Sequence, residues 1–171
     1  RIMSYIRRAK EYGITDATGK VDFAAVMQRV QGVIETIEPH DSPERFTSLG
    51  VDCVSGFARI VSPYEVEVDG KIITTESIVI ASGARPFVPP VPGLDSIDYL
   101  TSDSVWSLTE LPRRLLVVGG GPIGCELAQA FSHLGSKVTQ VDMATRIMPR
   151  EDEEVSAAVS ARFAEQDIDV L

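Results

Sequence analysis

The sequence contains few of the residues that build metal sites and disulfide frameworks. Its 171 residues include two cysteines and two histidines, which are far apart in the chain. Neither a C-x-x-C metal site nor a disulfide framework is therefore expected, and Cys53 and Cys125 are interpreted as free thiols in a reducing compartment. This composition favours a cytoplasmic protein that has no metal centre.

Long apolar runs and an excess of positive charge are also absent. No apolar run approaches the roughly 20 residues that a bilayer-spanning helix needs, so no membrane partner is expected. Aspartate and glutamate outnumber lysine and arginine by 25 to 16. A protein that binds the nucleic-acid backbone needs a cationic face, so nucleic acid is not an expected partner either.

The most informative stretch has the pattern of a dinucleotide-binding βαβ unit. An apolar strand, LLVV, ends in the loop GGGPIG, in which Gly119, Gly121 and Gly124 form the pattern G-x-G-x-x-G. The first glycine permits a tight turn, the second lets the backbone approach a pyrophosphate, and the third lets the next helix pack closely on the sheet. Pro122 suits the first turn of that helix, whose free N–H groups point at the phosphates.

A second strand, over residues 137–141, follows this helix and ends in Asp142. The dinucleotide fingerprint has an acid about 20 residues beyond the first glycine, where it accepts hydrogen bonds from the ribose hydroxyls. A carboxylate there would repel the additional phosphate of NADP, so NAD is the favoured cofactor. Arg146 and Arg150 are close enough in sequence to keep NADP as the less favoured alternative. A plain structural βαβ turn is the competing interpretation of the whole stretch.

The rest of the chain changes from helical to two-residue periodicity at about residue 51. Helices are expected over residues 1–12, from Asp22 to Pro39, and over residues 42–49. Short strands are expected over residues 51–54, 57–61, 64–68 and 71–74, and the last three form an antiparallel meander. Residues 77–81 (SIVIA) predict a buried parallel strand that runs into the turn at residues 82–86, a second candidate contact with a ligand. A structural turn would also use Ser-Gly, so this second contact stays open.

Four sequence features, taken in order, resemble the pyridine nucleotide-disulfide oxidoreductases, the flavoenzymes that include mercuric reductases and dihydrolipoamide dehydrogenases. They are the meander after Gly56, the segment TESIVIASGARP, the unit GGGPIGCELAQAF and the segment RIMPRED. The resemblance implies an α/β fold, with a Rossmann-like parallel βαβ unit and a small antiparallel meander from a flavoprotein with two dinucleotide-binding domains. It further implies that residues 1–110 are the later part of an FAD-binding domain and residues 111–171 the first part of an NAD-binding domain.

The resemblance also implies roles for particular residues. The expected contacts with FAD come from Gly56, Ala58, Ala81, Ser82, Gly83 and Arg85. The expected NAD loop consists of Gly119, Gly121, Pro122, Ile123 and Gly124. Ile123 matches a position where some relatives carry a tyrosine that shields the flavin, and Asp142 matches the acid typical of NAD-using members. Glu126 matches a carboxylate that pairs with a lysine near the flavin, which implies support of the flavin side and not a catalytic role.

The implied function is that of an FAD-dependent oxidoreductase. It passes hydride from NADH to the flavin and on to a dithiol/disulfide or a metal acceptor, with a small-molecule or disulfide substrate and a homodimeric parent protein. The family's first FAD loop, its redox pair C-x-x-x-x-C and its dimerisation domain do not occur in these residues. We therefore expect the chain to be an inactive fragment without a catalytic residue of its own. A non-catalytic nucleotide-binding module and a thiol-independent flavin reductase remain alternatives.

Overall fold

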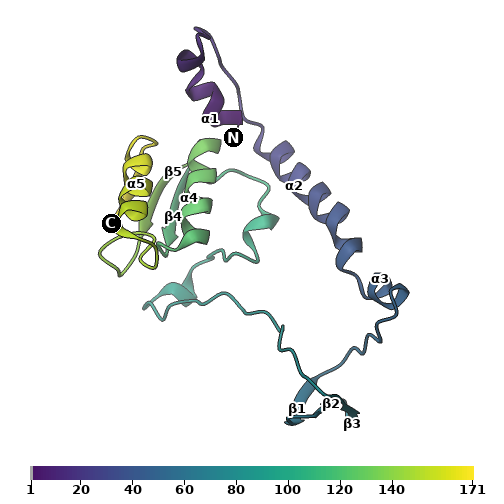
Figure 1. Cartoon of the computed structure of the whole chain (residues 1–171). Coiled ribbons are helices and arrows are strands. Elements are labelled where there is room, and N and C mark those ends of the chain that lie inside the picture. The colour runs from purple at the N-terminus through teal and green to yellow at the C-terminus, as the bar shows by residue number, and fades with distance from the viewer. Residues whose placement is uncertain (1) are drawn as a thin grey trace. The chain divides into compact units, whose positions relative to one another are not determined.

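The computed structural model describes residues 2–171 and forms two compact units. One unit contains the residues up to Val30 together with Leu100–Leu171, and the other contains Gln31–Tyr99. Helix α2 (Phe23–Ile37) begins in the first unit and ends in the second (Figure 1). No helix among the described residues is both long enough and apolar enough to cross a membrane.

The first unit is built around a parallel three-stranded sheet. The strands β4 (Arg114–Val118), β5 (Lys137–Val141) and β6 (Ile168–Val170) lie side by side in chain order. Helix α4 (Pro122–Leu134) connects β4 to β5, and helix α5 (Glu153–Ala164) connects β5 to β6 (Figure 1). Leu115 pairs with Val138, and Val138 pairs with Ile168. The predicted βαβ unit is thus confirmed.

Both connecting helices pack on one face of this sheet. Phe131 of α4 and Phe163 of α5 share one buried cluster with Val138 and Ile168 of the sheet. The alternate residues of a strand point to the opposite face, and on that face Leu116 is 60% exposed in the structure. The first unit therefore has its core between the sheet and the pair of helices.

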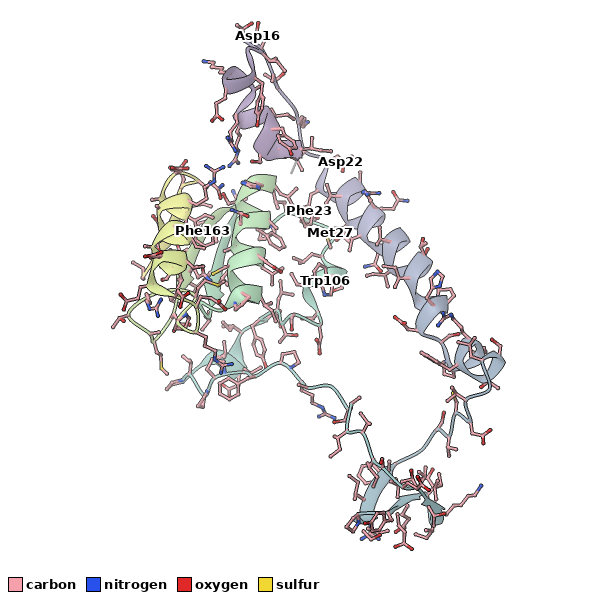
Figure 2. All side chains as sticks on the ribbon, viewed as in Figure 1. Asp16, Asp22, Phe23, Met27, Trp106 and Phe163 are labelled. Atoms are coloured by element: carbon pink, nitrogen blue, oxygen red, sulfur yellow. The ribbon has the colours of Figure 1, made fainter. Side chains whose placement is uncertain are left out.

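The N-terminal helical segments and the first part of α2 belong to this unit, and they lie within the ranges that the sequence predicts. Helix α1 (Ile2–Arg7) and the 3₁₀ helix η1 (Ala9–Tyr12) are closed by Gly13 at φ 77°. Asp22 caps α2, because its Oδ1 accepts the N–H of Ala25 at 3.0 Å. Phe23 at the start of α2 packs beside Phe131 with ring centroids 6.1 Å apart, and Met27 joins the same cluster (Figure 2).

The second unit contains an antiparallel meander after two short helical segments. The helical segments are η2 (Glu38–Asp41) and α3 (Pro43–Ser48), and the strands are β1 (Ala58–Ser62), β2 (Glu65–Val68) and β3 (Lys71–Thr74). The strands pair in the order β1-β2-β3. The hairpin between β2 and β3 turns at Asp69 and Gly70, both at positive φ. The predicted meander is therefore confirmed.

Two predicted strands are wrong. Residues 51–54 and 77–81 have no strand structure, and Val79 and Ile80 are 88% and 73% exposed. A strand becomes regular only when a neighbouring strand pairs with its backbone groups, and neither segment has such a neighbour among the described residues. Residues 77–81 are mostly apolar, as a buried strand would be, but apolar composition alone does not supply a pairing strand.

Short 3₁₀ helices occupy the connection between the meander and β4. They are η3 (Leu94–Ser96) and η4 (Val105–Ser107). The helical structure after Asp103 is thus one short turn. The side chain of Trp106 donates its Nε1–H to the carbonyl of Ser102 at 2.6 Å (Figure 2), and Val105 is buried in the core of the first unit.

Candidate functional site

The loop between β4 and α4 has the backbone geometry that its glycines predict. Gly119 lies at φ 118°, a conformation that residues with a side chain rarely adopt. Its N–H donates to the carbonyl of Val141 at 2.8 Å, which extends the pairing of β4 with β5 by one residue. The chain can therefore leave the sheet abruptly and reach the start of α4 (Figure 1).

The second and third glycines differ in what surrounds them. A Cβ added to Gly121 would meet no atom within 4 Å, whereas one added to Gly124 would collide with the carbonyl oxygen of Gly119. Gly121 is thus open on its side-chain side, where the fingerprint leaves room for a pyrophosphate. Gly124 is needed for the close contact between the start of α4 and the loop.

Helix α4 begins directly at this loop. Gly121 is its N-cap and Pro122 lies in its first turn. The N–H groups of a first helical turn have no partner within the helix, and together with the helix dipole they favour an anion. Ile123 is 62% exposed, and Glu126 one turn further along is also exposed. The two residues are accessible, while Cys125 between them is buried.

Asp142 lies against the glycine loop. One carboxylate oxygen accepts the N–H of Gly120 at 2.5 Å, and the other accepts the N–H of Ala144 at 2.7 Å. Both bonds lower the pKa of Asp142 below its ordinary value, and the bond from Ala144 contributes most. The carboxylate is therefore charged at neutral pH. Each oxygen retains acceptor capacity beyond its one bond, which leaves Asp142 able to accept a hydroxyl.

The segment after Asp142 forms one wall of a cleft beside the loop. Met148 donates its N–H to the carbonyl of Gly120 at 2.6 Å, and Ile147 is buried in the core. The cleft has a volume of about 490 Å³ and is lined by Gly121, Pro122, Met148, Pro149, Arg150 and Glu151. The helix start and the second glycine thus face the same hollow.

The two arginines of this segment differ in position. Arg150 lines the cleft. Arg146 turns to the segment itself, where its Nη2 donates to the carbonyl of Pro149 at 3.3 Å. The Nη1 of Arg146 is buried without a hydrogen-bond partner among the described residues. Arg150 is therefore the cation that lies on the surface of the cleft.

Sequence reasoning missed the role of Gln140. This residue is fully buried on β5, and its Nε2 donates to the carbonyl of Gly119 at 2.8 Å. A polar residue two positions before Asp142 points to the same side of the strand, which was the available signal. The sequence analysis also missed Met148, whose contact with Gly120 joins two loops that no local pattern connects.

The residues expected to contact FAD lie in the other unit. Gly56 lies at φ 155°, and a Cβ there would collide with the carboxylate of Asp69. Phe57, between Gly56 and Ala58, donates its N–H to Oδ1 of Asp69 at 3.1 Å, which connects the entry into the meander to the β2–β3 turn. Glycine is therefore required at position 56 by its own neighbours.

The remaining expected FAD residues are in an exposed segment without regular structure. They are Ala81, Ser82, Gly83 and Arg85. Gly83 lies at φ 68°, so the backbone does turn there as the Ser-Gly sequence predicts. Their roles stay predictions.

The parallel strands, the glycine loop, the helix that starts at the loop and the acid at the end of β5 together define a Rossmann-type βαβ unit, the class of fold on which dinucleotides are bound. Residues 16–171 match the sequence model of the family described as pyridine nucleotide-disulphide oxidoreductase. The chain belongs to this family. Homologues in the family use FAD and NAD(P)H.

Similar proteins include mercuric reductases and dihydrolipoyl dehydrogenases. A mercuric reductase from Staphylococcus aureus is 34% identical over 93% of this chain and 29% of its own length. A dihydrolipoyl dehydrogenase from Chlamydia pneumoniae is 33% identical over 99% of this chain and 37% of its own length. The chain thus spans well under half the length of these relatives.

Among solved structures, the chain is similar to the HOCl-induced flavoprotein disulfide reductase RclA from Escherichia coli. The TM-score is 0.71 and the sequence identity 29%, over 97% of this chain and 37% of that protein. The similarity confirms the α/β fold class and extends across nearly the whole chain.

Proposed function

We propose that the protein containing this chain is an FAD-dependent oxidoreductase that passes hydride from NADH to the flavin and on to a dithiol/disulfide or metal acceptor. FAD and NADH supply the redox chemistry when bound, and the residues of this chain bind and orient them. Membership of the pyridine nucleotide-disulphide oxidoreductases supports this proposal. A homodimeric protein in the cytoplasm is part of the same proposal, and the two free cysteines agree with a reducing compartment.

We assign the NAD-binding role to residues 111–171, which lie in the first unit. The glycine loop and the first turn of α4 would bind the pyrophosphate, because Gly121 is open and adjoins the cleft. Asp142 would accept hydrogen bonds from the ribose, and the exposed Ile123 and Glu126 would face the flavin side. The same proposal assigns residues 1–110 to the later part of the FAD-binding domain and residues 111–171 to the first part of the NAD-binding domain.

We assign the FAD-binding role to residues of the second unit. Gly56 and Ala58 would pass the adenine, and Ala81, Ser82, Gly83 and Arg85 would form the second FAD motif. Gly83 lies at positive φ and has no atom within 4 Å of the position of an added Cβ, which supports a close approach of a ligand to the backbone at that turn. A visible flavin spectrum of the purified chain would test whether these residues alone retain FAD, and we expect little retention.

One observation carries the NAD assignment: the charged carboxylate of Asp142 is bonded directly to the glycine loop. We expect the purified protein to bind NADH more tightly than NADPH in a fluorescence titration, because the charge repels a 2′-phosphate. Asp142→Asn removes the charge but keeps the shape, and should reduce the preference by about tenfold, equivalent to about 1.4 kcal/mol.

The matched control for this experiment is Asp169→Asn. Asp169 is an exposed acid on β6 of the same sheet, so its replacement changes the net charge equally without touching the loop. The preference for NADH should be unchanged in this variant. Tighter binding of NADPH by the unmodified protein would refute the assignment of NAD.

A further inference from the structure

We infer that Gln140 is a positioning residue that fixes the peptide between Gly119 and Gly120, and so prepares the glycine loop for the dinucleotide. This inference rests on the proposed function. The carbonyl of Gly119 accepts from Nε2 of Gln140 at 2.8 Å, and the N–H of Gly120 donates to Oδ2 of Asp142 at 2.5 Å. That carbonyl and that N–H belong to one peptide group, so both of its ends are bound, one by Gln140 on β5 and the other by Asp142 directly after β5.

This peptide has an unusual need for such support. It joins two glycines, and glycine populates positive and negative φ with similar ease. A rotation of the peptide plane would exchange the directions of its carbonyl and N–H at little steric cost. This peptide directly precedes Gly121, the N-cap of α4, so its orientation shapes the loop beside the start of the helix.

The third glycine makes the bond from Gln140 possible. A Cβ on Gly124 would lie 3.0 Å from Nε2 of Gln140 and would also collide with the carbonyl oxygen of Gly119. The absence of a side chain at Gly124 therefore leaves the space in which amide and carbonyl meet. Glycine at this position permits the packing of the helix and the contact that orients the loop.

The side-chain amide of Gln140 is set by its surroundings. It is fully buried, and a buried amide needs hydrogen-bond partners. Only its NH₂ group can donate to the carbonyl of Gly119. The thiol of Cys125 lies beside the amide, with Sγ 3.6 Å from Nε2 and 3.9 Å from Oε1. The hydrogen bond to the Gly119 carbonyl thus determines the orientation of the Gln140 amide.

If Gln140 only stabilised the fold, its replacement would leave the NADH affinity of the folded protein unchanged. If it positions the loop, its replacement lowers that affinity. Gln140→Met keeps the length of the side chain and removes the donor. We expect it to weaken NADH binding by about tenfold, because the carbonyl of Gly119 loses its partner and the peptide can rotate. Gln129→Met is the matched control, since Gln129 on α4 also bonds through its side chain, to Gln166 at 2.9 Å, away from the loop. The control should retain the affinity for NADH.

Gln140→Glu supplies a second readout. A protonated carboxyl can donate to the Gly119 carbonyl and a carboxylate cannot, so the NADH affinity of this variant should rise by about tenfold between pH 8 and pH 5.5 relative to the unmodified protein. Hydrogen bonds from the backbone of Ala144 and Gly120 lower the pKa of the adjacent Asp142, and burial raises the pKa of Cys125, so both shifts lead away from this pH range. A pH profile identical to that of the unmodified protein would overturn the inference.

Amide hydrogen exchange without nucleotide tests the peptide itself. The Gly120 amide should exchange about tenfold faster in Gln140→Met than in Gln129→Met. In Gln140→Met the carbonyl of the same peptide has lost its hydrogen bond, so the peptide rotates more easily and exposes the N–H to water. Equal exchange, or NADH affinity of Gln140→Met within twofold of the unmodified protein, would overturn the inference. If the unmodified protein binds no NADH while the exchange difference is present, the proposed function fails and the positioning of the peptide stands.

Discussion

Asp142 and His133 both have pKa values below their ordinary ones, for opposite physical reasons. Backbone N–H groups from Ala144 and Gly120 favour the charged form of Asp142. Burial of His133, followed by the positive charge of Arg7, disfavours the charged form of the imidazole. The last turn of α4 would by its dipole favour a cation, so burial outweighs the dipole at His133. The two groups therefore respond differently to acid.

The stability contributed by the Asp142 hydrogen bonds is present above its ordinary pKa of 3.8 and is lost as the pH falls through the lower value of the folded protein. Protonation of His133 affects the free energy of unfolding at a higher pH. Below its ordinary pKa of 6.5, the unfolded chain takes up the proton before the folded protein does, so acid lowers the free energy of unfolding. Mild acid should therefore act on stability through His133 and not through Asp142.

This difference predicts the effect of His133→Gln. Between pH 7 and pH 5 the free energy of unfolding of the first unit should fall less in this variant than in the unmodified protein. Urea unfolding at the two pH values measures the change. His40→Gln is the control, because His40 is exposed on η2 in the other unit. The same pH dependence in His133→Gln and the unmodified protein would show that His133 does not cause the acid effect.

At the level of elements, the turn from β4 into α4 contains glycines that are needed for two different reasons, folding and ligand binding. Gly124 is needed by the fold, because the Gly119 carbonyl lies where its Cβ would be. Gly121 is not, because it lies at φ −76° and has open space around it. The open space matters only when a ligand enters it. The two positions therefore distinguish stability from binding.

Alanine at each position should give opposite results. Gly124→Ala should lower the free energy of unfolding by about 1–3 kcal/mol through overpacking. Gly121→Ala should change it by less than about 1 kcal/mol yet weaken NADH binding by about tenfold or more, since its Cβ takes the space of the pyrophosphate. Thermal unfolding and fluorescence titration measure the two effects. Undiminished NADH binding by Gly121→Ala would place the pyrophosphate elsewhere.

On the scale of the whole molecule, the buried core is unevenly distributed. Every residue of the main buried cluster belongs to the first unit. In the second unit, Val68 is the one hydrophobic residue among those described that is buried. Hydrophobic burial is the main source of stability, so the second unit has little of its own. Its meander depends chiefly on strand pairing.

Hydrogen exchange should show this difference directly. Amides of β5, which pairs on both sides with β4 and β6, should exchange slowest. Amides of β1 and β3 should exchange at least about tenfold faster, and those of residues 77–92 faster still, because few buried contacts oppose local opening. Mass spectrometry of peptides from the purified chain measures the rates. Equal protection of β1 and β5 would contradict the uneven core.

Local patterns predicted much of the fold and the backbone geometry of the glycine loop. The turn at Gly119, the start of α2 after Asp22 and the antiparallel meander each depend on a few adjacent residues, and each lies where expected. The order of strand, glycine loop, helix, strand and acid also predicted the βαβ unit that ends in Asp142. These features follow from backbone stereochemistry and periodicity, which are properties of short segments.

Only the tertiary structure decided the features that depend on distant partners. The bond of Gln140 to the Gly119 carbonyl and that of Met148 to Gly120 join residues far apart in sequence. Residues 77–81 have the composition of a buried strand yet stay exposed, because a strand is formed by its neighbours as much as by its own residues. The sequence by itself thus determined where the chain turns and which faces are apolar, whereas pairing and burial were decided by what lies beside each segment in space.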